Sequence, residues 1–565
     1  MKVLAGMAAL LAAVGQAPGG NATVPGEVTT PYPTLIHLAV EWRVEGDDNL
    51  DGAVTVRYRA AGETAWRQGP PLRRIPADAC KSYPAYTWEN KHSGTLFDLR
   101  PDTEYEVRLT LADPDGGSAE RTVRARTRAV PRAMPGAPAR RARPETLKEV
   151  LAGARPGDVV LLEAGQYGEV IVEKDGAPQK PLVIRSAGGA VLASLALRGR
   201  RHVIVEGLAV SDKVDLTGAE DCAVRRCTVT ISRRTFGIGA PAKPGCTNCT
   251  ITDNVVTGPT PWTNEAMGAR GKNAGEGIQV TGPGNVIACN RVRGFRDCIS
   301  TMESGSVHNQ VCIDIYNNDI YVGADDGIEA DYCQGNCRIL RNRLTNCFTG
   351  LSSQPGLGGP TYFLRNVMYN LTYAAFKLHN YSRGDLVLHN TVVKPGDGLS
   401  CFTHEAFDRA VFRNNLCIGG PAGGVRWGGY GGGSGAPARI RAVGPDSSFD
   451  FDALGTHGTA FQGSIGDQAF ASFEELRRGP QERHAVRADM GVFAGVAFPE
   501  APLTEHAPPD LRPRAGSAVV DKAERLPGIN DGFAGQGPDI GAYEAGRPLP
   551  HYGPRPEGAD EENMP

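Results

Sequence analysis

The sequence predicts an all-β protein in which a β-sandwich precedes a right-handed parallel β-helix. Three observations predict this fold. The 72 glycines and 41 prolines indicate many tight turns. Residues 28–128 contain short alternating strands, which are typical of a sandwich. The middle of the chain repeats a β-rich segment at intervals close to 24 residues, which is typical of a solenoid.

The composition is that of a soluble protein with room for more than one domain. The chain has 565 residues, of which 41% are hydrophobic and 22% are charged, so it can bury a large core. The formal net charge of -3 and the lack of a basic stripe argue against a nucleic-acid partner. Beyond the N-terminus, no stretch is apolar for long enough to cross a bilayer. We therefore expect no membrane span, and we expect a monomer.

Residues 1–20 have the pattern of a signal peptide. Lys2 supplies a positive charge, the apolar stretch from Val3 to Val14 follows, and small residues surround Ala17. An apolar N-terminal strand or a lipid-anchored start is the alternative. The segment predicts that the protein is secreted or periplasmic.

Residues 28–128 are predicted to form the sandwich. The segments LIHLAVEWRV, AVTVRYRA, YEVRLTLAD and RTVRART alternate between apolar and polar residues. The stretch from Leu99 to Val107 resembles the tyrosine-corner strand of fibronectin type III domains, with Trp42 as the core tryptophan. The resemblance implies a module that spaces or presents a catalytic domain; a carbohydrate-binding module is the alternative. Residues 129–143 read as a linker.

The β-helix is predicted to cover residues 144–435 and to begin with a short helix. Leu147, Val150, Leu151 and Ala154 have the spacing of one apolar helix face. A helix here would cover the exposed apolar end of the first coil.

The repeat predicts a ladder of stacked asparagines. The segments NCTITDN, VCIDIYN, NCRILRN, TYFLRN, LVLHN and AVFRN end at Asn254, Asn317, Asn342, Asn366, Asn390 and Asn414. Stacked amides can bond one another from coil to coil, and asparagine tolerates a left-handed backbone. Several cysteines precede this position and should point inward; neighbouring coils would also permit a disulfide.

The last third of the chain is predicted to close the solenoid. Residues 436–549 would hold the final coils and a cap, because GPDIGAYEAG at 537–546 resembles the closing motif of many secreted bacterial β-helix proteins. Residues 550–565 are acidic and are predicted to form a disordered tail.

A second strand in each coil predicts which side chains point outward. Aligning GEGIQVT, RDCISTM, DDGIEAD, FTGLSSQ, AAFKLHN and GDGLSCF gives an inward column of Ile278, Ile299, Ile328, Leu351, Phe376 and Leu399. Because strand side chains alternate, the next residue of each segment points outward: Gln279, Ser300, Glu329, Ser352, Lys377 and Ser400. A further outward column contains Thr281, Met302, Asp331, Gln354, His379 and Phe402.

Carboxylates gather on two adjacent coils of this alignment. They are Asp297, Asp325, Asp326, Glu329 and Asp331. Carboxylates at strand spacing repel one another unless protonated or bridged by a cation, and so many oxygen ligands suit Ca²⁺. Asp325 and Asp326 have an alternative role as turn-forming residues. Lys377 and His379 lie two coils further on, roughly 10 Å from Glu329 at the strand spacing; the alternative is a solvated lysine and a surface histidine.

These residues resemble the β-helix polysaccharide lyases, most nearly the family-nine pectate lyases. The matching positions are Asp297, the segment Asp325-Asp326-Gly-Ile-Glu329, and Ala375-Phe376-Lys377-Leu378. The sequence departs from that pattern, because Glu329 replaces an aspartate, Ala375 replaces a glycine, and a coil intervenes between the lysine and the carboxylates. The resemblance implies Ca²⁺ on Asp297, Asp326 and Glu329, and Lys377 as the base.

The implied reaction is β-elimination in an acidic, uronic-acid-containing polysaccharide, with His379 as an alternative base or as the acid. Trp262, in an inserted loop, could stack on a sugar face or pack on the coil. Gln279 and Gln354 are further candidates for substrate binding.

Two other functions fit the same residues. A glycoside hydrolase could use Asp326, Glu329 and Asp331 as acid and base, although the G-H-G and R-I-K segments of polygalacturonases are missing. The D-P-H-D motif of β-helix alginate epimerases is missing too. A non-catalytic glycan-binding or surface solenoid is the third possibility.

Overall fold

The computed structural model describes residues 20–561, apart from 233–234, 304–306 and 423–425. The predicted signal peptide therefore lies almost entirely outside the described residues. Among the residues that are described, no helix is both long and apolar enough to cross a membrane.

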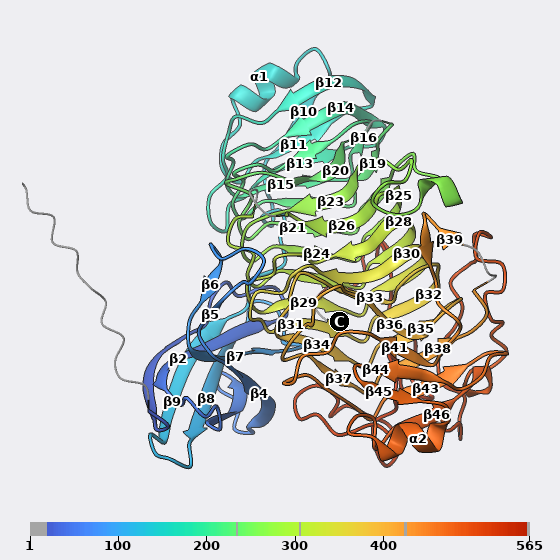
Figure 1. The fold of residues 1–565 in the computed structure, drawn as a ribbon. Helices are drawn as coiled ribbons and strands as arrows, with labels where there is room; N and C mark the ends of the chain where they lie inside the picture. Colours follow the sequence, from blue (N-terminus) through green and yellow to red (C-terminus); the bar gives the residue numbers. More distant parts are fainter. Residues whose placement is uncertain (1–19, 233–234, 304–306, 423–425, 562–565) are drawn as a thin grey trace, which may run out of the picture.

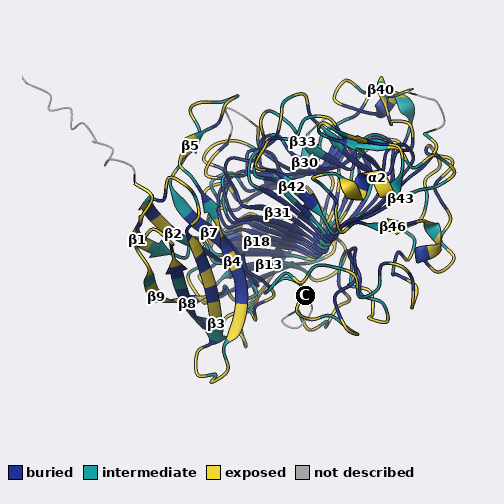
Figure 2. Ribbon diagram, turned by 60° about the horizontal axis from the view of Figure 1, so that its bottom comes forward, coloured by how far each residue is buried: buried dark blue, intermediate teal, exposed yellow. Residues whose placement is uncertain are grey.

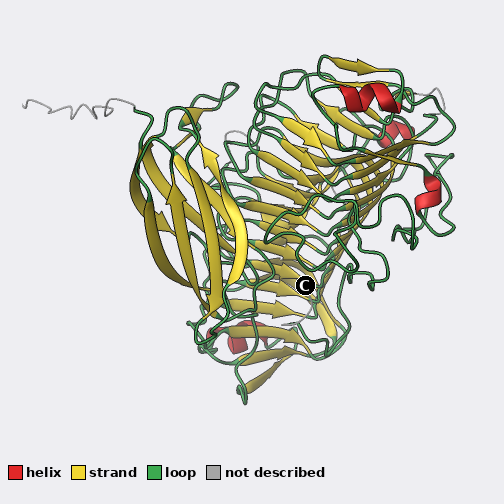
Figure 3. Cartoon of the chain, turned by 90° about the horizontal axis from the view of Figure 1, so that it is seen from below, coloured by secondary structure: helices red, strands yellow, loops and turns green. Residues whose placement is uncertain are grey.

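An antiparallel β-sandwich forms the N-terminal part of the chain and lies beside the solenoid (Figure 3). Its strand order is β1-β2-β7-β4-β3-β8-β9. The strands are β1 (Thr23–Thr29), β2 (Leu38–Gly46), β3 (Ala53–Ala60), β4 (Arg67–Ile75), β7 (Lys91–Leu96), β8 (Glu104–Ala112) and β9 (Ala119–Arg126), with a small hairpin of β5 (Asp78–Ala79) and β6 (Thr87–Trp88). Trp42 is fully buried in the core, as predicted. The hydroxyl of Tyr105 accepts a hydrogen bond from the backbone N–H of Arg100 at 2.8 Å, which is the contact of a tyrosine corner.

Parallel strands stack into a β-helix, which Figure 1 shows from its first coils at the top to its last coils at the bottom. Among the described residues, one sheet contains 13 strands. They are β10 (Ala139–Ala142), β11 (Val159–Leu162), β13 (Leu182–Ser186), β15 (Val203–Glu206), β18 (Ala223–Arg225), β21 (Thr250–Thr252), β24 (Val286–Ala288), β27 (Asp314–Tyr316), β29 (Cys337–Leu340), β31 (Thr361–Leu364), β34 (Asp385–Leu388), β37 (Val411–Arg413) and β42 (Ser448–Asp450).

The second large sheet contains 22 of the described strands and wraps around two sides of the stack. The side that matters for the site holds β20 (Phe236–Ala240), β23 (Glu276–Val280), β26 (Asp297–Thr301), the ends of β28 (Asp319–Glu329) and β30 (Arg343–Ser353), β33 (Phe376–Leu378), β36 (Leu399–Phe402) and β41 (Ala438–Ile440). The other side holds, among others, β22 (Val255–Thr257), β25 (Arg291–Phe295), β32 (Val367–Leu371), β35 (Thr391–Val393), β38 (Leu416–Gly419), β43 (Ala453–Thr456) and β46 (Val486–Ala488).

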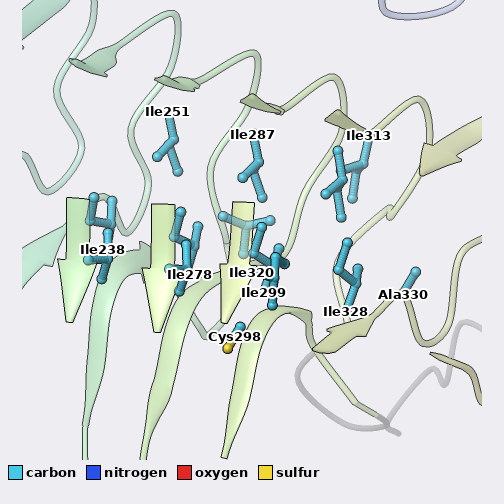
Figure 4. Close-up of a cluster of buried hydrophobic side chains, with 14 of the residues drawn as sticks. Ile238, Ile251, Ile278, Ile287, Cys298, Ile299, Ile313, Ile320, Ile328 and Ala330 are labelled. Atoms are coloured by element: carbon cyan, nitrogen blue, oxygen red, sulfur yellow. The ribbon is translucent and has the colours of Figure 1, made fainter. Parts of the chain in front are cut away.

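Aliphatic side chains from facing strands fill the inside of the coils. Ile251 and Ile287 lie opposite Ile238 and Ile278 in successive coils (Figure 4). The strands of the stack are accordingly buried along most of their length (Figure 2). This core continues from coil to coil, so each coil is stabilised mainly by its neighbours. The cysteines contribute to it as free thiols: all 13 are unpaired and 12 of them are buried.

The asparagine ladder is present, but two of its predicted members were wrong. The side chain of Asn318, not Asn317, bonds Asn290 in one direction and Asn342 in the other. Asn415, not Asn414, likewise accepts from Asn390 at 2.9 Å. Asn317 and Asn414 precede the ladder position and have positive φ angles of 53° and 62°.

The predicted cap helix is α1 (Leu147–Ala152), whose Leu147 and Leu151 are buried against the first coils. The solenoid begins before it. β10 lies within the expected linker and pairs in parallel with β11, with Ala142 buried at its end. Further helical turns are α2 (Phe473–Arg478), η1 (Asn264–Ala266) and η3 (Met490–Val492).

The end of the chain runs back along the solenoid, and the prediction of a disordered tail fails for residues 550–561. Tyr552 is buried, and Arg555 pairs with Asp253 at 2.7 Å. Glu561 pairs with Arg225 at 2.6 Å. Glu561 is held here because Arg225 and Arg226, on the outer surface of the early coils, are both its partners. Residues 562–565 lie outside the described residues.

Candidate functional site

The predicted outward columns lie on one face of the second large sheet. Ile299, Ile328, Leu351 and Phe376 pair in register from coil to coil, which places Ser300, Glu329, Ser352 and Lys377 in one outward row. The alignment fails at the last coil, where Cys401 and not Leu399 pairs with Phe376. The residue beside Lys377 is therefore Phe402, not Ser400, because the preceding turn is two residues longer than the alignment assumed.

A β-bulge in β28 shapes the acidic part of the site. Gly323 pairs with Cys347 and Asp326 pairs with Thr349, so β28 contains one more residue than β30 over this interval. A bulge re-aims side chains and is common next to functional sites. Here it gives the two adjacent aspartates different surroundings.

Asp297, Asp326 and Glu329 come together as the core of the cluster. Each offers a carboxylate oxygen, and these oxygens all lie within 4.8 Å of one another. Asp297 Oδ1 accepts a hydrogen bond from the backbone N–H of Asp326 at 2.7 Å. All three side chains are buried, and Asp326 Oδ1 has no hydrogen-bond partner among the described residues.

Asp325 is not one of these three carboxylates, although burial, Asp326 and Asp297 raise its pKa well above its ordinary value. Its Oδ2 is 3.5 Å from Nε of Arg296, which is also 3.5 Å from Asp297 Oδ2. Arg296 was missed in the sequence, although it directly precedes Asp297. The neighbouring carboxylates, Asp297 first, raise the pKa of Arg296 further. Asp325 and Asp297 thus share one guanidinium, but only Asp297 belongs to the group of three carboxylates.

Asp331 lies at the edge of the cluster and forms a second acidic group with Glu329 and Glu303. Its Oδ1 accepts a hydrogen bond from Ser352 Oγ at 2.6 Å, whereas its Oδ2 has no hydrogen-bond partner among the described residues. Burial raises the pKa of Asp331 to about 8, although Lys377 and Ser352 oppose the shift. Near neutral pH this carboxyl can hold a proton.

Lys377 reaches across one whole coil to the carboxylates. Its Nζ is in contact with Asp326 and lies 3.7 Å from Glu329 Oε1. The intervening coil presents the small side chain of Ser352 at the paired position, so the lysine can extend over it. Lys377 and Glu329 are two coils apart, as expected, but the extended lysine side chain spans that distance.

The buried carboxyls of the cluster raise one another's pKa. Burial, together with Asp326, raises the pKa of Asp297 to about 6. Burial, Asp297 and Asp331 raise the pKa of Glu329 well above its ordinary range. Burial alone lowers the pKa of Lys377, but Asp326 and its neighbours outweigh that effect and raise it well above its ordinary value. Asp297 and Glu329 therefore keep their protons to higher pH than ordinary carboxyl groups do.

His379 lies on the same outward face, beyond Lys377. Its Nδ1 is 2.9 Å from Glu405 Oε2, and its ring is 5.0 Å from the rings of Phe402 and His404. Burial lowers the pKa of His379, while Glu405 opposes the shift. Glu405 was missed in the sequence because it lies in a turn outside the aligned segments.

The three predicted substrate-binding residues have different surroundings. Trp262 is buried, and its Nε1 donates to the Pro502 carbonyl oxygen at 2.9 Å, so its packing on the coil leaves little ring face for a sugar. Gln279 lies in the outward row beside Ser300. Gln354 is half-buried directly after β30.

The β5–β6 hairpin of the sandwich borders the site. The ring of Tyr83 is 5.1 Å from that of Tyr332, which directly follows Asp331. Ser82 Oγ donates to the carbonyl oxygen of Asn380 at 3.0 Å, immediately after the site histidine. The sandwich is therefore in contact with the turns that follow the site strands.

Comparison with known proteins gives no further identification. No protein-family model matches the chain, and no curated protein sequence matches it either.

Proposed function

We propose that this protein is an exported polysaccharide lyase that cleaves a uronic-acid-containing polysaccharide by β-elimination. The observation that carries the proposal is the contact of Lys377 Nζ with Asp326, inside a carboxylate cluster on the outer face of the solenoid. A lysine amine and several carboxylates together are the groups that proton abstraction next to a sugar carboxylate requires. The predicted signal peptide and the partial resemblance to family-nine pectate lyases support it.

The residues present fit a calcium ion. Asp297, Asp326 and Glu329 are the residues that would hold it, because hard oxygen ligands suit Ca²⁺ and Asp326 Oδ1 is buried without a partner among the described residues. When bound, the ion would supply positive charge that acidifies the substrate C5–H and offsets the carboxylates around Lys377.

The side chains themselves would carry the protons. Neutral Lys377 would take the C5 proton at Nζ as the C4–O4 bond breaks and the C4=C5 double bond forms. The leaving O4 needs a proton, and the protonated ring of His379, directly after β33, would donate it. Glu405, paired with His379 Nδ1, would fix the orientation of the ring so that Nε2 faces the ligand.

The decisive test is the product. The purified protein is incubated with a panel of uronic-acid polysaccharides, and ultraviolet absorbance measures unsaturated product. Lys377→Ala should reduce the rate by at least about 100-fold, the usual contribution of a positioned general base, and a chelator should abolish activity reversibly. Lys180→Ala, an exposed lysine on an early coil, is the matched control and should leave the rate unchanged. A rate unaffected by Lys377→Ala would refute the proposed mechanism.

A glycoside hydrolase is the second candidate, and one observation favours it. Asp331 and Glu329 offer carboxylate oxygens within 4.8 Å of each other, and the pKa of Asp331 is raised to about 8. A protonated acid beside a second carboxyl is the arrangement of a retaining hydrolase, whose carboxyls lie about 5 Å apart. New reducing ends without unsaturation would support this function. Binding without any cleavage would indicate a glycan-binding solenoid.

A further inference from the structure

The outward row of the site continues beyond Lys377 toward the last coils. Lys377 pairs with Phe402 in the next coil. In the coil after that, Ser400 pairs with Arg439. The same register, continued by two residues, places Arg441 next to Phe402. Cys401 directly precedes Phe402, Ile440 directly precedes Arg441, and both of these preceding residues contact the core. Because strand side chains alternate, Phe402 and Arg441 lie on the outward side.

Phe402 is the aromatic member of this row. Its side chain is half-buried, and its ring lies 5.0 Å from the ring of His404 and 5.7 Å from that of Tyr373. The neighbouring rings hold it in place, so little side-chain entropy would be lost when a ligand stacks on it. Fixed aromatic rings with an apolar face suit the apolar face of a pyranose.

Arg441 is the cationic member. It is exposed, and no carboxylate among the described residues forms an ion pair with it. Its neighbour Arg439, by contrast, has its Nε 3.3 Å from Asp397 Oδ2. An exposed, unpaired guanidinium at the end of an outward row can form a bidentate pair with a ligand carboxylate.

We propose that Phe402 and Arg441 extend the binding site along the solenoid axis and bind further sugars of an anionic polysaccharide. This inference rests on the proposed function. Adjacent coils are about 4.8 Å apart, a spacing comparable to the advance of a polysaccharide per sugar. A chain whose reacting sugar lies at Lys377 would therefore place the next sugar over Phe402 and the carboxylate of a later one near Arg441.

The test measures how binding depends on ligand length. Size-defined oligogalacturonides, with oligomannuronates as a second series, are titrated by calorimetry against the full-length protein. The wild type should gain affinity with each added sugar up to the length that reaches Arg441. Arg441→Ala and Phe402→Ala should each weaken binding of long oligosaccharides by about tenfold, the factor that corresponds to 1.4 kcal/mol, and leave short ones unaffected.

The kinetics give an independent readout. Both substitutions should raise KM for the polymer. Arg441→Ala should also leave kcat within about twofold, because the removed contact is made equally in the ground state and the transition state. The kcat of Phe402→Ala is not used as a control, because the Phe402 ring is 5.0 Å from that of His379. Arg487→Ala, an exposed arginine on β46 on another side of the solenoid, is the matched control and should change neither parameter. Circular dichroism verifies that the variants are folded.

The outcomes separate the two proposals. Cleavage whose KM and length dependence are unchanged in Arg441→Ala and Phe402→Ala would overturn this inference and leave the lyase intact. Length-dependent binding that both substitutions abolish, without unsaturated product, would support the extended site and overturn the lyase. Failure of the wild type to bind either series would overturn the assignment to uronic-acid chains.

Discussion

At the scale of single residues, the asparagine ladder shows what a repeat can predict and what it cannot. The period was visible in the sequence, because Asn342, Asn366 and Asn390 are 24 residues apart. Two coils contain an asparagine pair, as in Asn317-Asn318, and there the choice between neighbours was wrong. The first residue of the pair has a left-handed backbone and the second forms the ladder. Asparagine suits both positions, so its identity alone could not decide between them.

In the corrected ladder, the two asparagines of such a pair contribute unequally to stability. Asn318 accepts from the backbone N–H and the side chain of Asn290, and it donates to the Ile287 carbonyl oxygen and to Asn342. Asn318→Ala would leave several buried groups without partners, each costing about 1–3 kcal/mol. We expect it to lower the free energy of unfolding by about 3 kcal/mol or more, measured by urea denaturation.

The adjacent position is the control. Asn317 has a φ of 53°, a conformation that glycine adopts without strain. Asn317→Gly would lose the hydrogen bond that the side chain donates to the His551 carbonyl oxygen and the long one that it accepts from Arg341 Nε at 3.3 Å, so we expect a loss of about 1–2 kcal/mol. A larger loss for Asn317→Gly than for Asn318→Ala would contradict the ladder assignment.

At the scale of strands, the alternation of side chains correctly placed Glu329 and Lys377 on one outer face. What the sequence could not indicate is the effect of irregularities. The bulge in β28 separates Asp325 from Asp326, and a longer turn moves Phe402 to the position expected for Ser400. The docked β5–β6 hairpin was also unpredicted, because contacts between distant segments leave no local pattern in the sequence.

The bulge makes a testable distinction between two adjacent aspartates. Asp326 belongs to the carboxylate cluster, whereas Asp325 is 3.5 Å from Arg296. We expect Asp326→Asn to reduce Ca²⁺ affinity by at least about 100-fold, or 2.7 kcal/mol, in calorimetric titrations. Asp325→Asn should reduce it by less than about tenfold. Equal losses would show that both aspartates bind the ion, and no Ca²⁺ binding by the wild type would remove calcium from the proposal.

At the scale of the whole molecule, the sandwich is part of the solenoid's structure and not a spacer. Phe97 of the sandwich contacts Tyr362 of the solenoid, with ring centroids 5.0 Å apart. Both belong to a buried apolar cluster shared by the two parts. Arg341 and Asp98 form an ion pair of 2.8 Å at its edge. An apolar interface of this kind favours a fixed arrangement over independent domain motion.

A buried ionic group lies at the centre of this interface and predicts that the two parts unfold together. Asp314 on β27 contacts Arg338 and lies 2.8 Å from Nδ1 of His37, and all three side chains are fully buried. Asp314→Asn would leave Arg338 without its counter-charge, which typically costs about 3–5 kcal/mol. We expect calorimetry to show one unfolding transition for the wild type, moved to lower temperature as a whole in the variant. Asp98→Asn, at the partly exposed pair with Arg341, should cost about 1 kcal/mol or less.

The buried pair of Asp314 and Arg338 also predicts how the stability difference between the wild type and Asp314→Asn depends on pH. Burial alone would raise the pKa of Asp314, but Arg338 and His37 hold it well below its ordinary value. Because the pKa of Asp314 is lower in the folded state, its ionisation stabilises that state at pH values above about 3.9, the pKa of an aspartate in the unfolded chain. This stabilisation is lost as the pH falls below that value. The gap in unfolding free energy between the wild type and Asp314→Asn should therefore narrow as the pH falls from about 5 toward 3. Two separate transitions, of which the substitution moves only one, would show that the interface does not couple the two parts.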